Sequence, residues 1–432
     1  MSKNPEANQP QFDTVGTASA FRALRHRDFR LLWFGQIISV TGSQMQSIAI
    51  HWHVYLLTES ALALGLVGLF KGLPIIVCSL IGGVIADVAD RRRLMVATQS
   101  LMLISAALLT IFTFMGLQNP WPIYLLTGVA SGAQAFDIPA RQALLPTLVP
   151  PRDFPNAVSL SLIVFNVALI VGPSIAGFLL ASWSPSFIYA LNALSFLAVI
   201  LALIVMKTSG RIDFAEVQPP KVGFGALKEG LRFVRSTPII VQTMTLDFVA
   251  TFFASANALL PIFAKEILMV GAAGFGFLNA APAAGSVIAG LVMARLGTLR
   301  HQGRVIIASV AVFGLATIAF GLSRIFWFSL LMLALVGAAD TGSAILRQTI
   351  RQLATPNHLR GRMTSINMVF FMGGPQLGEL EAGLLASLLR APLSVAIGGA
   401  GSLVAALIAL RKAKTLVSYD GRLDAEPPRV TT

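Results

Sequence analysis

The sequence predicts an all-helical membrane protein with twelve transmembrane helices, and three observations lead to this prediction. First, 55% of the 432 residues are hydrophobic and only 12% are charged, so that the mean hydropathy is +0.76. A water-soluble globule of this size could not bury so much apolar surface. Second, apolar segments of membrane-spanning length recur along the whole chain. Third, the basic residues are concentrated between these segments.

A helix needs about 20 apolar residues to cross the hydrocarbon core of a bilayer. Twelve segments meet this requirement, at approximately 31–56, 62–86, 94–117, 121–146, 157–182, 185–206, 239–264, 271–294, 304–322, 325–350, 363–388 and 391–410. Because the number is even, we expect both termini on one side of the membrane.

The distribution of lysine and arginine predicts which side this is. Short loops rich in these residues stay in the cytoplasm. With the amino terminus inside, nearly all of the 32 basic residues fall in cytoplasmic termini, loops and helix ends; the exceptions are Lys71, Lys265, Arg324 and Arg390. The sequence therefore predicts a multi-pass protein of the bacterial plasma (inner) membrane with both termini cytoplasmic.

A polar stretch at the midpoint divides the chain into two groups of six spans. The predicted organisation is a cytoplasmic tail at 1–28, a six-helix half at 29–206, a cytoplasmic linker at 207–238, a second six-helix half at 239–410 and a cytoplasmic tail at 411–432. In the second part of the linker, apolar and basic residues alternate with helical spacing, which predicts an amphipathic helix on the inner leaflet. A disordered linker is the alternative, chiefly for 208–222.

The two halves resemble copies of one another. A shift of 206 residues places Arg141 on Arg347 and Gly172 on Gly378. Transporters built from such repeats bind their substrate at the interface between the halves, near the middle of the bilayer.

The charged segment 82–94 lies between two predicted spans and reads as a tight loop. It contains Gly83, Asp87, Arg91 and Arg92. Glycine lets backbones approach closely, a carboxylate stabilises a neighbouring helix amino terminus, and arginines hold the loop on the cytoplasmic side. This combination is typical of a transporter hinge, or gating motif.

Two further patterns fall in the fourth and fifth spans. The fourth span ends with Asp137 and Arg141, followed by Pro146, and the fifth contains Gly172, Pro173 and Gly177. Proline removes a backbone donor and glycine allows close contact, so the fifth helix can bend and approach a partner.

Together these patterns resemble the major facilitator superfamily over essentially the whole chain, in the branch of siderophore exporters and macrolide efflux proteins. The resemblance implies two six-helix halves related by pseudo-two-fold symmetry, an antiporter-like motif in the fifth helix, and Asp87 placed against the start of the eleventh helix. Asp137 and Arg141 could extend the contact of Asp87 into a latch on the cytoplasmic side. The alternative is that the arginines only enforce topology.

Charged residues inside spans are costly and are therefore functional candidates. Lys71 lies at a depth in the second span that matches Glu379 and Glu381 in the eleventh. Since these two helices face each other in the superfamily, we expect Lys71 to pair with one glutamate in a periplasmic gate, with a slight preference for Glu381. Alternatively, Lys71 extends to the interface and both glutamates line the cavity.

Asp247 and Asp340 lie near mid-membrane and are candidates for a proton or substrate site, because desolvation favours protonation of a carboxylate. Gln36, Asn166 and Asn257 are candidates for polar lining of a cavity. Each of these residues could instead be structural.

Several functions are excluded by the sequence. No phosphate-binding loop, nucleophile elbow or metal-ligand cluster occurs, so we expect neither an enzyme nor any cofactor or metal. No nucleic-acid recognition motif accompanies the net charge of +13. The single cysteine, Cys78, rules out a disulfide within the chain.

The sequence predicts a secondary active transporter that exports a small amphipathic molecule of the drug or siderophore class by alternating access. Its expected partners are this substrate, protons as the coupling ion and membrane lipids, and we expect a monomer. An importer or facilitator of the same fold is the alternative. A transport-inactive membrane sensor or assembly partner is the alternative of another class.

Overall fold

The computed structural model describes residues 21–208, 224–297, 299–356 and 359–421. Within these ranges, the side chains outside the description are those of 80–84, 86–88, 224–228, 230, 360–362, 364–365, 368–369 and 371–372. The predicted tails and the first part of the linker therefore lie largely outside the described residues.

Twelve long helices account for most of the described chain, and the prediction of an all-helical fold is confirmed. The first six are α1 (Arg27–Thr58), α2 (Ala61–Val88), α3 (Arg91–Phe114), α4 (Trp121–Leu148), α5 (Phe154–Ser182) and α6 (Pro185–Val205). The second six are α8 (Pro238–Phe253), α10 (Gly271–Leu296), α11 (Gln302–Leu322), α12 (Phe326–Ala354), α13 (Arg360–Leu389) and α14 (Ala391–Lys412).

Short helices complete the described structure. They are η2 (Arg22–Arg25), η3 (Pro151–Asp153), α7 (Phe224–Ser236), η4 (Ala256–Leu259), α9 (Leu260–Ile262), η5 (Phe263–Ile267) and α15 (Lys414–Val417). The helix α7 coincides with the amphipathic segment of the predicted linker, and its Val234 is buried in a hydrophobic core of the second half.

Nine of the described helical segments are long and apolar enough to cross a membrane. The long helices α1 and α4 are not among them, because each carries several polar residues in its interior. Polar residues in membrane helices face the interior of a bundle or a water-filled cavity. These two helices are therefore the first to consider when looking for a functional site.

One predicted span is not a continuous helix. The segment 239–264 is interrupted after α8, and the chain passes through η4 before α9 begins. Pro261 lies in the first turn of α9, where its missing N–H is tolerated. In the interior of a continuous helix its ring would clash with the carbonyl of residue 257, and the restart of the helix avoids this cost.

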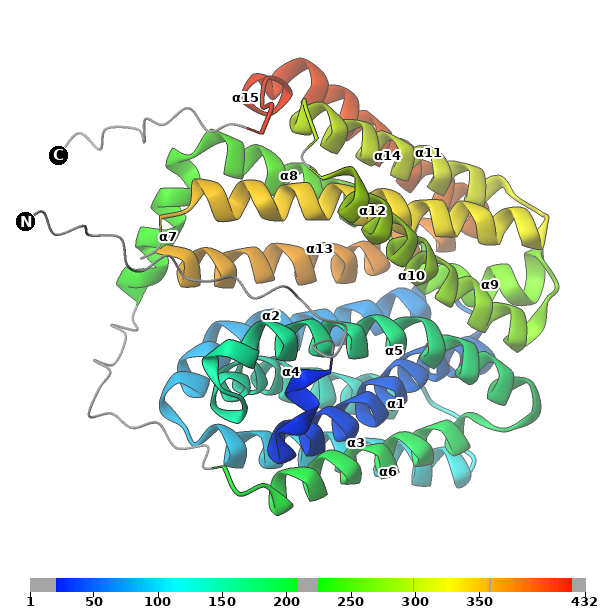
Figure 1. Ribbon diagram of the computed structural model, residues 1–432. Coiled ribbons are helices and arrows are strands. Elements are labelled where there is room, and N and C mark those ends of the chain that lie inside the picture. Colours follow the sequence, from blue (N-terminus) through cyan, green and yellow to red (C-terminus); the bar gives the residue numbers. More distant parts are fainter. Residues whose placement is uncertain (1–20, 209–223, 298, 357–358, 422–432) are drawn as a thin grey trace, which may run out of the picture.

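The helices form two bundles, one of α1–α6 and one of α8–α14 (Figure 1). Two pairs of helices pack across the boundary, α2 with α13 and α5 with α10. Glycines face each other in both pairs, Gly65 with Gly383 and Gly177 with Gly276. Without side chains at these positions the backbones come into direct contact.

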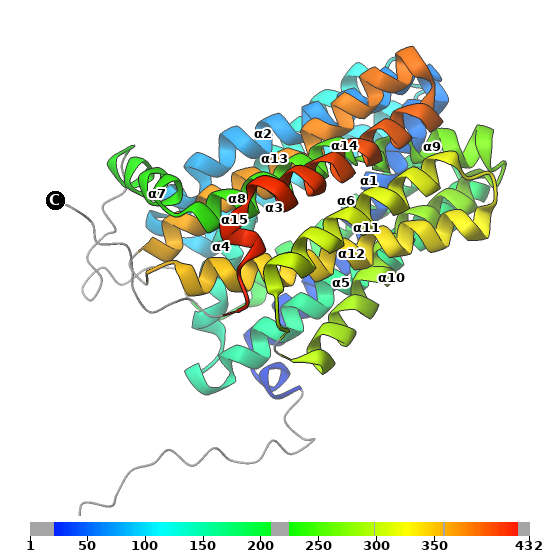
Figure 2. The same ribbon diagram turned by 90° about the horizontal axis from the view of Figure 1, so that it is seen from above.

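The two ends of the molecule differ in how the halves are joined. We call the end that carries α7 and α15 the terminal side, and the opposite end, near α9, the far side (Figures 1 and 2). On the far side one hydrophobic core combines both halves, for example Tyr55 and Leu180 with Phe263 and Phe275. On the terminal side each half has a separate core among the described residues.

Polar and aromatic contacts reinforce the far-side junction. Lys265 forms an ion pair with Glu59 at 2.9 Å. The Tyr55 hydroxyl donates a hydrogen bond to Glu266, and the ring of Trp52 stacks on that of a phenylalanine in α10 with centroids 5.3 Å apart. In this structure the halves are therefore closed against each other on the far side.

Candidate substrate cavity and buried charges

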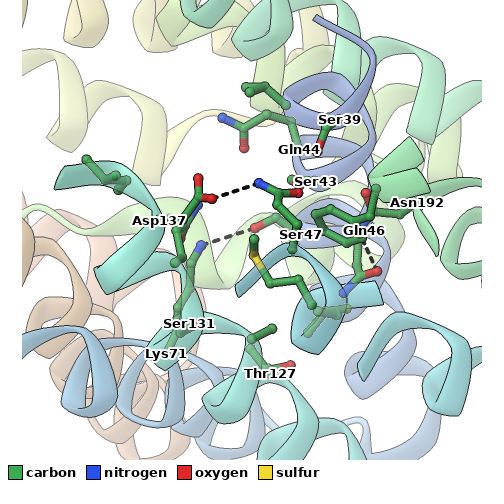
Figure 3. Close-up of a pocket in the computed structure, with 18 of the residues that line it drawn as sticks. Ser39, Ser43, Gln44, Gln46, Ser47, Lys71, Thr127, Ser131, Asp137 and Asn192 are labelled. Atoms are coloured by element: carbon green, nitrogen blue, oxygen red, sulfur yellow. Dashed lines mark hydrogen bonds between the residues drawn. The ribbon is translucent and has the colours of Figure 1, made fainter. Parts of the chain in front are cut away.

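A polar cavity of about 170 Å³ lies within the first half. Its wall is formed by α1, α2, α3, α4, α5 and α6. Figure 3 shows serine, threonine, amide and charged side chains projecting into it from several helices. The polar residues that distinguish α1 and α4 from the nine membrane-length helices have a structural reason, because both helices line this cavity.

The helix α1 contributes a stripe of polar residues to the cavity wall. Gln36, Ser39, Ser43, Ser47 and His51 recur at intervals of three or four residues, which places them on one face. Gln36 was predicted to line a cavity, and it does. The other residues of the stripe were not predicted from the sequence. Their signal was the recurrence of polar residues with a helical period within an apolar segment.

Lys71 reaches the cavity from α2. Its ammonium donates a hydrogen bond to the Ser47 hydroxyl at 3.2 Å (Figure 3). Among the described residues no ion pair joins Lys71 to Glu379 or Glu381. The predicted periplasmic gate between Lys71 and a glutamate therefore stays a prediction.

The two glutamates of α13 face different neighbours. A Cβ added at Gly68 of α2 would lie 2.7 Å from Oε2 of Glu379, so Glu379 is the glutamate that faces α2. Glu381 shares its face with Gly374 and Gly378, and these glycines pack against α8. As a partner for Lys71 the geometry favours Glu379, whereas the sequence pattern slightly favoured Glu381. The reason is that the face of α13 that carries Glu381 packs against α8 and not against α2.

Glu379 contacts a histidine that the sequence analysis had assigned to no site. Its Oε2 lies 3.7 Å from Nε2 of His51, and both side chains are 10% exposed. Nδ1 of His51 donates to the Ser47 carbonyl at 2.8 Å, so in a neutral imidazole Nε2 carries the lone pair. Neither Nε2 nor Oε2 has a hydrogen-bond partner. Nε2 of His51 and Oε2 of Glu379 therefore face each other as two acceptors, and one proton between them would give each atom a hydrogen-bond partner.

The pair proposed as a cytoplasmic latch lies on the cavity wall. Asp137 accepts hydrogen bonds from Thr98 at 3.2 Å and from Gln99 at 3.0 Å. Arg141 donates to the amide oxygen of Gln36. Asp137 and Arg141 form no ion pair with each other among the described residues, and a latch function for them stays a prediction.

In the second half, Asp247 and Asp340 converge on a buried arginine. Nη2 of Arg347 lies 2.6 Å from Asp247 and 3.5 Å from Asp340, and Nη1 donates to Ser343 at 2.5 Å. The side chains of Arg347 and Asp247 are 3% and 9% exposed. The two aspartates, predicted separately, thus belong to one cluster. Its arginine had been noted only as the repeat partner of Arg141.

The remaining candidates are more scattered. Asn166 is exposed and bonds to a carbonyl of its own helix, and Asn257 is exposed in η4, so neither lines the cavity. Their assignment as lining of a cavity stays a prediction. Gly172 packs against α1 and Gly177 against α10, with Pro173 between them. The glycines therefore do bring α5 close to two partners.

The loop between α2 and α3 holds the first half together. Arg91 donates to a carbonyl of α4, and Arg92 to a carbonyl near the end of α6, both at 2.9 Å. Asp90 caps α3 by accepting two backbone N–H groups. The side chains of Gly83 and Asp87 lie outside the described residues, so the contact expected for Asp87 is not described.

No group of histidine, cysteine and acidic side chains that could hold a metal ion occurs in the described part of the chain. A cavity lined by polar side chains in a bundle of membrane-length helices, built as two six-helix groups, is typical of a transporter of the major facilitator type. The chain is a multi-pass membrane protein.

The comparison with family models agrees with this class. Residues 18–424 match the model of the transmembrane secretion effector family, and the chain belongs to this family. It is similar to the enterobactin exporter EntS of Shigella boydii, with 26% identity over 407 residues that cover 94% of this chain and 95% of the relative. The enterobactin exporter of Salmonella typhimurium is 25% identical, covering 89% and 92%.

Solved structures confirm the fold. A POT family transporter superimposes with a TM-score of 0.70 at 12% identity, covering 92% of this chain and 99% of the other. A bacterial homologue of the iron transporter ferroportin, in an inward-facing state, superimposes with a TM-score of 0.66 at 16% identity, covering 91% and 99%.

Proposed function

We propose that the protein exports a small molecule from the cytoplasm by alternating access, driven by an inward flow of protons. The observation that carries this proposal is a polar cavity whose far-side end adjoins a proton-accepting pair, His51 and Glu379, between the two halves. Export is supported by the relatives named enterobactin exporters. With the termini cytoplasmic, as the basic residues indicate, the terminal side faces the cytoplasm.

In this arrangement the structure corresponds to the state that loads substrate. The halves share a core on the far side, so the cavity is shielded from the outside. When the far side opens, His51 and Glu379 separate from one another and either can take up a proton from the outer solution. After the substrate has left, closure of the far side brings that proton into the cavity lined by His51, from which it leaves on the cytoplasmic side. Each outward movement of substrate is then matched by an inward movement of a proton.

The cluster of Asp247, Asp340 and Arg347 is proposed as a second site that responds to protons. A proton on Asp247 would remove its charge and weaken its 2.6 Å contact with Arg347. The released guanidinium would then depend on Asp340 alone. Such a change alters the packing of α8 against α12 and links protonation to helix movement.

Everted membrane vesicles test the proposal. In these vesicles the cytoplasmic face is outside, and respiration acidifies the lumen. Addition of a transported compound should release protons, measured with a fluorescent pH indicator, and the compound should accumulate in the lumen. A library of siderophores, macrolides and dyes supplies the candidates, and vesicles lacking the protein supply the control. Proton-coupled export is rejected if no compound produces either signal. Movement of a compound out of the lumen would indicate an importer.

A further inference from the structure

The repeat-related arginines Arg141 and Arg347 have different partners. Arg347 is neutralised by two aspartates. Arg141 lies at the equivalent place in the first half but is held by the neutral amide of Gln36. Among the described residues no carboxylate contacts Arg141, so its charge is not balanced by an acidic side chain in the described part of the first half.

A second cation in the same cavity is also held by a neutral partner. Lys71 contacts the Ser47 hydroxyl and forms no ion pair among the described residues. Both cations lie on the wall of the cavity, and His51 can add a third positive charge when protonated. A charge inside a membrane domain without a counter-ion is costly, which points to a partner that arrives from outside the chain.

The carboxylate on the described wall of this cavity does not cancel these charges. Asp137 is 4% exposed and accepts two hydrogen bonds from neutral groups of α3, Thr98 and Gln99. Glu379 is turned toward His51 at the closed end and does not line the cavity. The described wall carries two positive charges, on Lys71 and Arg141, and one negative charge, on Asp137, and is therefore positive on balance.

We propose that this cavity recognises an acidic group of the transported molecule, a carboxylate or an ionised phenol, through Lys71 and Arg141. The amide and hydroxyl groups of the α1 stripe then contact polar groups on the rest of the molecule. The proposal deepens the proposed function by naming the substrate class as anionic, and it rests on the first half of the molecule being the recognition half.

The charge of the cavity can be measured without knowing the substrate. In a Cys78→Ala background, Ser43→Cys places one thiol on the cavity wall. Two methanethiosulfonate reagents of similar size, one bearing a sulfonate and one a trimethylammonium group, then compete for it. The ratio of their rates reports the local potential, because thiol ionisation affects both rates equally.

We expect the ratio of the sulfonate rate to the trimethylammonium rate to be higher at Ser43→Cys than at an exposed control site, and Lys71→Met or Arg141→Gln to lower this ratio by about tenfold at low salt. Ser184→Cys, on an exposed loop between α5 and α6, is the control site. Its ratio should not change with either substitution. A ratio at Ser43→Cys that is no higher than the ratio at Ser184→Cys, or that neither substitution alters, overturns the proposal.

Binding of a probe tests recognition itself. Purified protein in detergent is titrated by calorimetry with 2-naphthoate and with its neutral counterpart 2-naphthamide. We expect naphthoate to bind at least about tenfold more tightly, and Lys71→Met or Arg141→Gln to abolish the preference. Arg152→Gln, which removes a surface charge that is 77% exposed, should retain it.

Equal affinity for the two probes, or no binding of naphthoate up to about 10 mM, overturns the proposal. This assay requires no proton gradient, so the failure of proton coupling would leave its result intact. Conversely, the protein could export neutral or cationic compounds with protons and show no preference for anions in this assay. That result would reject the anionic substrate class and leave the proposed function intact.

Discussion

At the scale of single residues, the environment of each charge matters more than its residue type. Arg141 and Arg347 occupy equivalent positions of the predicted repeat, yet one faces an amide and the other two carboxylates. A buried ion pair offsets the cost of desolvating its members, whereas an unpaired cation keeps its field for another partner. The first arginine is thus available for binding, and the second holds two helices together.

Removing one member of the cluster in the second half should destabilise the protein. Asp247→Asn leaves Arg347 buried with only Asp340 beside it, and breaking a buried pair costs about 3–5 kcal/mol when no partner remains. Since Asp340 remains at 3.5 Å, we expect a loss toward the lower end, seen as a lower Tm in detergent.

The double variant Asp247→Asn, Arg347→Gln provides the control for this prediction. It removes both charges, so its Tm should lie above the value expected from adding the effects of the two single variants. Strict additivity would show that the two side chains do not stabilise each other.

Asp28 should make the stability of the protein depend on pH. It accepts hydrogen bonds from Thr208 and Lys207 and so connects the start of α1 to the chain after α6. Burial raises the pKa of Asp28, but these hydrogen bonds and the charge of Arg27 outweigh that effect and lower the pKa below its usual 3.8.

Because the pKa of Asp28 is lower in the folded protein, its carboxylate stabilises the fold above about pH 4 and loses this effect as the pH falls through the folded value. Asp28→Asn should therefore lower the Tm at pH 7, and the difference from the unmodified protein should shrink below pH 4. The measurement is a series of thermal unfolding curves from pH 3 to pH 7. A difference in Tm that stays constant over this range would contradict the assignment.

At the scale of helices, close backbone contact joins the two halves. A Cβ added at Gly177 of α5 would lie 2.6 Å from the Cα of Gly276 in α10. Such a distance cannot be accommodated without moving one helix away from the other. The antiporter-like motif of α5 thus acts here as a contact surface between the halves, which is a role its glycines can fill without touching the substrate.

Gly177→Val should weaken the far-side junction. We expect a loss of about 1–3 kcal/mol in stability, as in other overpacked sites, measured as a lower Tm. Gly290→Val in α10 is the matched control, since a Cβ at Gly290 meets no atom within 4 Å. Equal effects of the two substitutions would mean that helix propensity, and not the contact between α5 and α10, determines the change.

The sequence predicts the existence of the helices well because length and hydropathy determine them, as the described bounds of α3 and α6 show. The break after α8 escaped prediction, although Pro261 was a local signal for it. The contacts of the site escaped for another reason. Which face of α13 meets α2, and hence whether Glu379 or Glu381 lies near the cavity, depends on the rotation of a helix against partners distant in sequence.

At the scale of the whole molecule, the closure is one-sided. One core joins both halves on the far side, while two cores remain separate among the described residues of the terminal side. The sequence could not predict this, because which helix ends touch across the two halves depends on how the helices pack and not on their composition. Which side is closed is a property of the conformation and changes during alternating access.

Transport by purified protein in proteoliposomes tests the central claim most directly. The compound identified in everted vesicles is first placed at equal concentration on both sides of the membrane. A proton gradient directed toward the side of the termini is then imposed. Our account predicts that the compound moves outward against its own gradient, and that a protonophore stops this movement. Movement that ends at equal concentrations whether or not protons flow would contradict proton-driven export and would indicate a facilitator.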